Sequence, residues 1–387
     1  MNPSLQSEAE LTVVRPPVSF WKREPSLRET ILIWAICAVV FIAVASAFRP
    51  YRALVIDFGD TGAYVQIAEA IGSWSFSGIH VKQFWGVSYA VAVVYRLTGV
   101  SAATAILIVC FASSLLALVF ARRFWGGWVA LFALTLNFDW WQRSFLGGSE
   151  PLFVALLFAS FLMVRKERWL WAALLTSLAT VTRPLGIFLL VGIGVVLLFR
   201  RQWLRFALST LIGVVVGTLY ILPLKLYLHD PLATVHSYER VHPAATSSLF
   251  GIPFYSIIVS TLRNRGPWTN VALTFGWIFL VLAGSIAMVA TRQFRDYARS
   301  HPSEAIFAGL YLVSIYCYNG EGYYWSRAEF PRFAIPILPF VFLALLRCLP
   351  RWLVNDRRVI WILALVSSAL AACSALGIQN VLARLRG

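Results

Sequence analysis

The chain has 387 residues, of which 59% are hydrophobic and 13% are charged, and its mean hydropathy is +0.74. This composition excludes an ordinary soluble domain and predicts an all-α integral membrane protein. The formal charge of +16 does not indicate nucleic-acid binding, because Lys and Arg fall in short clusters between apolar runs, as they do in cytoplasmic loops of membrane proteins.

The cysteines also exclude a class of site. They are scattered through or beside apolar runs without CxxC spacing, so they predict neither a disulfide framework nor a thiolate metal centre. Packing of small, polarizable side chains is the simpler interpretation. The five positions are Cys37, Cys110, Cys317, Cys348 and Cys373.

The N-terminal segment 1–29 is polar and basic, which predicts a cytoplasmic tail. The first apolar run, 31–48, is too long for a signal-peptide core and lacks a small-residue cleavage pattern, so we expect it to remain as a membrane helix. The following segment, 49–98, contains an apolar stretch at 84–97 that is short and interrupted by Gly86 and Arg96. We expect it to lie along the membrane interface, because a crossing there would place the later basic clusters outside.

Ten further apolar runs follow, which gives about eleven crossings with the N-terminus inside and the C-terminus outside. We divide the chain into the tail 1–29, a membrane module 30–230 with the extracytoplasmic loop 49–98, and a second part 231–387 that begins with another extracytoplasmic loop. The ten runs are 100–121, 124–137, 148–164, 169–182, 184–199, 205–228, 271–290, 304–318, 333–347 and 359–380.

Two carboxylates, Asp57 and Asp60, follow the first membrane helix. After them Tyr64, Ile67, Ala68 and Ile71 recur at helical spacing, which predicts an amphipathic surface helix with Asp60 or Thr61 as its N-cap. Asp60 can be a plain cap, and Asp57 can be a solvated loop residue. Because acidic groups at the rim of a membrane bundle are costly, we predict that Asp60, or its rival Asp57, is a general base.

Several basic residues on the predicted outer side could bind an anionic phosphate. Arg183 lies at a tight corner before Pro184, where it could instead ease the helix ends. Arg332 and Arg327 flank Glu329, so a structural ion pair competes with phosphate binding. Lys82 could bind phosphate or lipid headgroups. Arg143, beside two tryptophans, is expected to anchor the membrane interface rather than to bind a ligand.

The loop 229–270 contains the sequence His236-Ser-Tyr-Glu239-Arg-Val-His242. His236, Glu239 and His242 could share a helical face and bind a divalent metal, although Pro243 soon ends any helix. Contact with the acceptor or a phosphate, or a solvated loop, is favoured over the metal, so we expect no cofactor. Tyr324 could stack on a sugar, although aromatic residues at this depth usually form the interface belt.

Three motifs resemble those of the GT-C superfamily of polytopic glycosyltransferases. Asp60-Thr-Gly-Ala-Tyr64-Val-Gln-Ile-Ala68 is similar to the "D-x-x-x-Y-x-x-I-A" opening of aminoarabinose and protein O-mannosyltransferase-like members. The second motif combines Gly148-Ser149-Glu150-Pro-Leu-Phe153 with Thr182-Arg183-Pro184-Leu-Gly186, and it is also similar to bacterial relatives of the GPI mannosyltransferase PIG-V. The third is Arg332-Phe-Ala-Ile-Pro336-Ile-Leu-Pro339.

The resemblance implies that a sugar, such as mannose or a pentose, passes with inversion from a polyprenyl-phosphate carrier to a hydroxyl acceptor at the extracytoplasmic face. It implies Asp60 as the base and seven helices as the shared module. Two features depart from it: Thr61 replaces the second acidic residue of some branches, and the His-Lys-Glu tripeptide of eukaryotic PIG-V is missing. Tyr64 and Glu150 are predicted to contact substrate, and the acceptor is a lipid, a polysaccharide or a protein. A transporter or flippase for lipid-linked or anionic solutes is the alternative.

Overall fold

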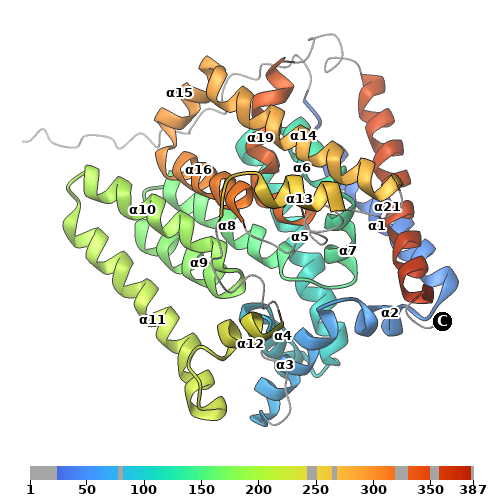
Figure 1. The fold of residues 1–387 in the computed structure, drawn as a ribbon, viewed down its shortest axis with the longest axis horizontal. Helices are drawn as coiled ribbons and strands as arrows, with labels where there is room; N and C mark the ends of the chain where they lie inside the picture. Colours follow the sequence, from blue (N-terminus) through green and yellow to red (C-terminus); the bar gives the residue numbers. More distant parts are fainter. Residues whose placement is uncertain are drawn as a thin grey trace, which may run out of the picture.

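The computed structural model describes residues 24–76, 82–241, 251–263, 268–318, 330–348 and 357–384. Throughout these ranges the secondary structure is helical, with no β-strand. Apolar helices pack into one bundle, and the short helices α2, α3, α4 and α12 gather at one end of it, whereas α15 lies at the opposite end (Figure 1). The predicted all-α membrane fold is confirmed.

The first part of the bundle runs from the N-terminal membrane helix to the long helix that precedes the second loop. Its elements are α1 (Leu27–Phe48), α2 (Tyr51–Asp57), α3 (Thr61–Ser73), α4 (Gly86–Thr98), α5 (Ala102–Trp125), α6 (Gly127–Thr135), α7 (Phe138–Phe145), α8 (Glu150–Arg165), α9 (Trp169–Thr182), the 3-10 turn η1 (Pro184–Gly186), α10 (Ile187–Phe199) and α11 (Trp203–Leu228).

The second part begins with short helices and returns to the bundle. Its elements are α12 (Ala233–Val241), α13 (Tyr255–Arg263), α14 (Trp268–Ala290), α15 (Arg292–Ser300), α16 (Pro302–Cys317), α18 (Phe330–Ala334), η4 (Ile335–Ile337), α19 (Leu338–Leu345), η5 (Leu346–Cys348) and α21 (Arg357–Arg384). The last of these helices, α21, packs along α1.

Four helical stretches of the described chain are long and apolar enough to cross a bilayer: Leu27–Phe48, Ala102–Trp125, Trp203–Leu228 and Arg358–Gly377. Two bent pairs raise this number to six if each pair is one span. Shorter apolar helices occupy other predicted positions, among them Trp169–Thr182 and Pro302–Cys317. The protein is therefore a multi-pass membrane protein, and the count of eleven crossings stays a prediction.

One predicted crossing, 124–137, has a different structure. Gly126 ends α5 with a φ of 94°, and the Asn137 side chain caps α7 by accepting hydrogen bonds from the backbone N–H groups of Asp139 and Trp140. The intervening α6 has nine residues. At 1.5 Å per residue it is about 14 Å long, too short for a hydrocarbon core of about 30 Å.

Helix starts follow local capping chemistry. Ser26 and Glu29 form a capping box before α1, and the Ser101 hydroxyl accepts a hydrogen bond from the N–H of Thr104 at the start of α5. Such bonds satisfy N–H groups that have no partner within the helix. These caps therefore fix where α1 and α5 begin.

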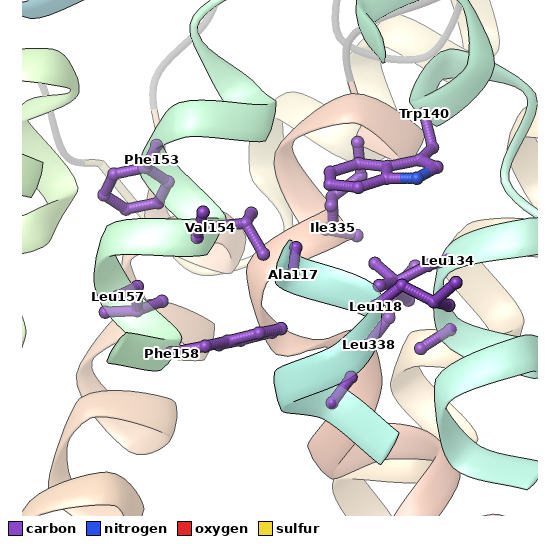
Figure 2. Packing of buried hydrophobic residues seen from close by; sticks show 14 of the residues in the cluster. Ala117, Leu118, Leu134, Trp140, Phe153, Val154, Leu157, Phe158, Ile335 and Leu338 are labelled. Carbon is purple, nitrogen blue, oxygen red and sulfur yellow. The ribbon is translucent and has the colours of Figure 1, made fainter. Parts of the chain in front are cut away.

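The core is built from close packing between α5, α8 and the segment from α18 to α19. Figure 2 shows Val154 of α8 beside Ala117 of α5, and Leu118 of α5 beside Leu134 of α6 and Leu338 of α19; all are buried. Trp140 is also completely buried. Since lipid is as apolar as these side chains, dense van der Waals packing, rather than removal from water, holds membrane helices together.

At the α15 end of the bundle, a buried polar cluster links α5, α8, α15 and α16. Arg165 binds both carboxylate oxygens of Glu304, at 2.6 and 2.7 Å. The Tyr297 hydroxyl accepts from Arg165 and from Trp125 Nε1 and donates to Glu304. Its donors and acceptors are matched, as a stabilising buried network requires.

Candidate active site

The turn between α2 and α3 is fixed to the turn between α7 and α8. The Thr61 hydroxyl donates a 3.0 Å hydrogen bond to the carbonyl oxygen of Gly147. Gly147 has a φ of 102°, and a Cβ there would lie 2.5 Å from Thr61 Cγ2. Glycine is therefore required for both the backbone conformation and the close approach. This contact brings Asp60 beside the start of α8.

Glu150 is the first residue of α8, directly after a sharp change of direction. The axes of α7 and α8 differ by 100°, so α7 lies across the end of the bundle while α8 runs into it. Pro151 occupies an early helical position, where its missing N–H has no cost. The Glu150 carboxylate, at the N-terminal end of α8, therefore lies near Arg183 at the end of α9 and Arg332 of α18.

Two arginines from distant parts of the chain bind the same oxygen of Glu150. Arg183 Nη1 and Arg332 Nε both donate to Glu150 Oε1, and Arg183 Nη1 lies 3.3 Å from the Ser149 hydroxyl. The Glu150 side chain is only 2% exposed. A buried carboxylate is tolerated only when opposite charges and hydrogen bonds compensate its desolvation, and this one has two guanidinium groups.

Asp60 occupies the N-cap position of α3 but does not cap it. Its side chain makes no hydrogen bond to the first turn of α3. Instead Asp60 Oδ1 accepts from Gln83 Nε2 at 3.3 Å, and Oδ2 lies 3.4 Å from Arg332 Nη2. The plain capping interpretation of Asp60 is therefore wrong.

Exposure separates the two carboxylates of this cluster. The Asp60 side chain is 35% exposed, whereas that of Glu150 is 2% exposed. Only Asp60 can therefore reach a substrate that arrives from outside the bundle. Burial alone would raise the pKa of Asp60, but the charges of Arg332 and Arg143 outweigh it and hold this pKa below its usual value. Asp60 is accordingly an ionised, accessible acceptor of protons.

An apolar groove of about 390 Å³ begins beside this cluster. It lies among η1, the neighbouring ends of α9 and α10, α11 and the start of α12. Phe84 and Pro184 line it, and the residues directly before them, Gln83 and Arg183, contact Asp60 and Glu150. The other lining residues are Thr180, Val181, Ile187, Gly217, Tyr220, Ile221, Leu224, Pro231, Leu232, Thr234 and Val235.

Helices α4 and α9 are in close contact next to the groove and the charged cluster. A Cβ at Gly86 would lie 2.6 Å from the backbone of Thr182, so only glycine permits this approach. Gln83, which precedes α4, and Arg183, which follows α9, thereby reach the same region. The apolar groove therefore lies next to the charged cluster, because Phe84 and Pro184 of its lining directly follow Gln83 and Arg183 in the chain.

The remaining predicted residues have varied positions. Tyr64 is 4% exposed, and its hydroxyl is hydrogen-bonded to Ser149, so it packs inside the cluster, where burial raises its pKa to about 12. Asp57 forms an ion pair with Arg49 at the end of α2. Lys82 is half-buried and precedes Gln83. His236 is exposed on α12, with Nδ1 2.8 Å from Asp230 Oδ2.

Some predictions fall outside the described structure. Arg327, Tyr324 and His242 lie outside the described residues, as does the side chain of Glu239. Their proposed roles stay predictions. Within the described ranges, no group of three or more His, Cys, Asp and Glu residues could hold a metal ion.

The sequence reasoning missed one cluster residue, Gln83, and favoured the wrong role for another, Arg143. Gln83 carries no recognisable motif, and its contact with Asp60 depends on the fold of α4 against α3. Arg143 was expected at the membrane interface because Trp140 and Trp141 precede it. Both tryptophans are 0% exposed, so this expectation is wrong: α7 lies inside the bundle end. The guanidinium of Arg143 instead lies over Phe58, with Cζ 4.8 Å from the ring centre.

No family model matches the chain, and no curated protein matches it. Among solved structures the chain is similar to ArnT from Cupriavidus metallidurans in the apo state. The two are 16% identical, the alignment covers 89% of this chain and 75% of that chain, and the TM-score is 0.48.

Proposed function

We propose that the protein is a membrane glycosyltransferase that moves a sugar from a polyprenyl-phosphate carrier to a hydroxyl acceptor. The observation that supports this most is the state of Asp60: a carboxylate that is 35% exposed, makes no capping bond and lies 3.4 Å from Arg332. The three sequence motifs that resemble the GT-C superfamily supply Asp60, Glu150, Arg183 and Arg332, which the fold brings together.

The proposed reaction is a single displacement. Asp60 takes the proton of the acceptor hydroxyl while that oxygen attacks the anomeric carbon of the donor. The bond from the anomeric carbon to the phosphate oxygen breaks, and its electron pair leaves with the polyprenyl phosphate. Inversion at the anomeric carbon follows from attack opposite the leaving group. Guanidinium groups beside the phosphate stabilise the growing negative charge on that oxygen.

The low pKa of Asp60 in the free protein fits this role. Nearby cations keep the carboxylate ionised, so it is ready to accept a proton. A donor phosphate bound to the same cations adds a negative charge nearby, which raises the basicity of Asp60 in the complex. Donor binding would thus switch on the base.

The apolar groove supplies a place for the lipid part of the donor. Its lining is almost entirely hydrocarbon, apart from a few hydroxyl groups such as those of Thr180 and Tyr220. A polyprenyl chain seated there would place its phosphate near Arg183, because Pro184 lines the groove. We further propose that the site faces the extracytoplasmic side, with mannose or a pentose as the sugar.

Transfer is distinguished from transport by the fate of the donor. The purified protein in lipid nanodiscs is given radiolabelled polyprenyl-phosphate sugars and an extract of candidate acceptors, and the products are separated. We expect label on a new acceptor and release of polyprenyl phosphate. Unchanged donor, together with donor movement across proteoliposome membranes, would contradict transfer and support a flippase.

The position of the cluster argues against a transporter. Transporters bind their substrates near the bilayer midplane between broken helices. Here Glu150 begins α8, Arg183 follows the last residue of α9, and Asp60 precedes α3. Substrate would therefore meet these groups at helix ends, at one end of the bundle.

A further inference from the structure

Arg143 enters the cluster from the last turn of α7. Its guanidinium interacts electrostatically with both Asp60 and Glu150. Space for its stem depends on Gly148, since a Cβ there would lie 2.7 Å from Arg143 Cδ. Phe58 covers one face of the guanidinium. The side chain is thus held in one place, between the turn that precedes Asp60 and the turn that precedes Glu150.

Two of the three guanidinium nitrogens of Arg143 make no hydrogen bond within the described structure. Nε and Nη1 are both buried and have no hydrogen-bond partner among the described residues. Leaving a buried charged donor without a partner is costly, so such a group in a native protein calls for an explanation. A ligand that accepts hydrogen bonds from Nε and Nη1 would explain why these two groups have no partner.

The other two arginines differ from Arg143 in this respect. Arg183 and Arg332 are both bound to Glu150, and Arg332 also faces Asp60. Glu150 therefore aligns two guanidinium groups, whereas Arg143 lies near the carboxylates without a hydrogen bond to either. Three guanidinium groups against two carboxylates leave these five ionised side chains with one net positive charge.

We infer that Arg143 is a phosphate-binding residue of this site, donating from Nε and Nη1 to the non-bridging oxygens of the donor's phosphodiester. A phosphodiester carries a single negative charge, which balances the net charge of the five side chains. The inference rests on the proposed function and assigns Glu150 a different role: it is a positioning residue that holds Arg183 and Arg332.

The experiment measures binding, not turnover. Wild-type protein, Arg143→Gln and Arg143→Lys are placed in nanodiscs, and the affinity for polyprenyl phosphate is determined by titration. Arg96→Gln is the control, because Arg96 is exposed on α4. Loss of a charge-assisted hydrogen bond predicts affinity weakened about tenfold to hundredfold in Arg143→Gln. We expect a smaller loss in Arg143→Lys, which keeps the charge but loses the fork geometry.

Further probes identify what Arg143 recognises. Affinity for polyprenol, which has no phosphate, should be the same in wild type and Arg143→Gln. Phosphatidylglycerol in the nanodisc should not compete with polyprenyl phosphate if the site selects the donor, whereas equal competition would indicate a general lipid-headgroup site and overturn the inference.

Thermal unfolding separates binding from a structural role. Because the charge of Arg143 favours the ionised forms of Asp60 and Glu150, Arg143→Gln should lower the melting temperature somewhat, and its affinity for polyprenyl phosphate should fall as well. A lower melting temperature with unchanged affinity for polyprenyl phosphate would make Arg143 structural and overturn the inference, while leaving the proposed function intact. If wild-type protein binds no polyprenyl phosphate, the inference about Arg143 and the proposed function are both wrong.

Discussion

Arg332 Nη2 lies 3.4 Å from Asp60 Oδ2, although 272 positions separate the two residues in the chain. Arg332 belongs to α18, near the end of the chain, and Asp60 precedes α3, just after the first membrane helix. The candidate site is therefore complete only when the second part of the bundle has packed against the first. The two parts predicted at 30–230 and 231–387 share this site.

The first prediction concerns the pH dependence of transfer. Gln83 Nε2 donates to Asp60 Oδ1, and this bond favours the ionised form. Gln83→Met removes the bond, so the pKa of Asp60 should rise. Because the base acts when ionised, the acid limb of the profile of kcat/KM against pH should move upward by roughly 0.5–1 unit.

Gln66→Met is the matched control, since Gln66 is exposed on α3, the helix that follows Asp60. Its acid limb should coincide with that of wild type. If Gln83→Met folds normally but the acid limb of its kcat/KM profile does not move, Asp60 is not the group whose ionisation controls this limb.

The second prediction concerns stability. Glu150→Gln removes the charge that pairs Arg183 with Arg332 and leaves two guanidinium groups close together in a buried site. Breaking a buried ion pair by removing one partner costs about 3–5 kcal/mol. The measurement is thermal or denaturant unfolding in detergent.

A surface pair provides the comparison. Glu167 and Arg200 are 2.9 Å apart with side chains 65% and 45% exposed, and Glu167→Gln should cost at most about 1 kcal/mol. Equal effects of the two substitutions would show that Glu150 does not organise its neighbours.

The third prediction tests the apolar groove. Gly217 lines it, and a Cβ at this position would meet no heavy atom within 4 Å. Gly217→Leu should therefore fold normally and fill part of the groove. The KM for a long-chain polyprenyl-phosphate sugar should rise several-fold, while that for a short-chain analogue changes little.

Gly309→Leu is the matched variant, because Gly309 of α16 also has open space around it and lies away from the groove. Its kinetic constants should equal those of wild type. If Gly217→Leu raised KM equally for both chain lengths, the groove would not be the lipid-binding surface.

Much of the fold could be predicted from the sequence, because long apolar runs and basic clusters directly reflect the bilayer. The runs at 169–182, 184–199 and 205–228 match helices α9, η1 with α10, and α11 within a few residues. The run 124–137 contains only the short helix α6, because Gly126 ends α5 and Asn137 caps the start of α7 at positions where hydropathy does not change.

The site was less accessible to sequence reasoning. Asp60, Glu150, Arg183 and Arg332 were found because each lies in a recognisable motif, but their mutual contacts were not. The capping role of Asp60 and the interface role of Arg143 were plausible locally, and both were decided by tertiary contacts. Nothing in the sequence places Gln83 next to Asp60, because that contact depends on how α4 packs on α3.

The most direct test compares Asp60→Asn with Asp57→Asn in the purified transfer reaction, with release of polyprenyl phosphate and donor affinity both measured. Asp60→Asn should bind the donor but release polyprenyl phosphate at least about a hundredfold more slowly, whereas Asp57→Asn, whose carboxylate pairs with Arg49, should react at nearly the wild-type rate. Release by Asp60→Asn at the wild-type rate would contradict the assignment of Asp60 as the base.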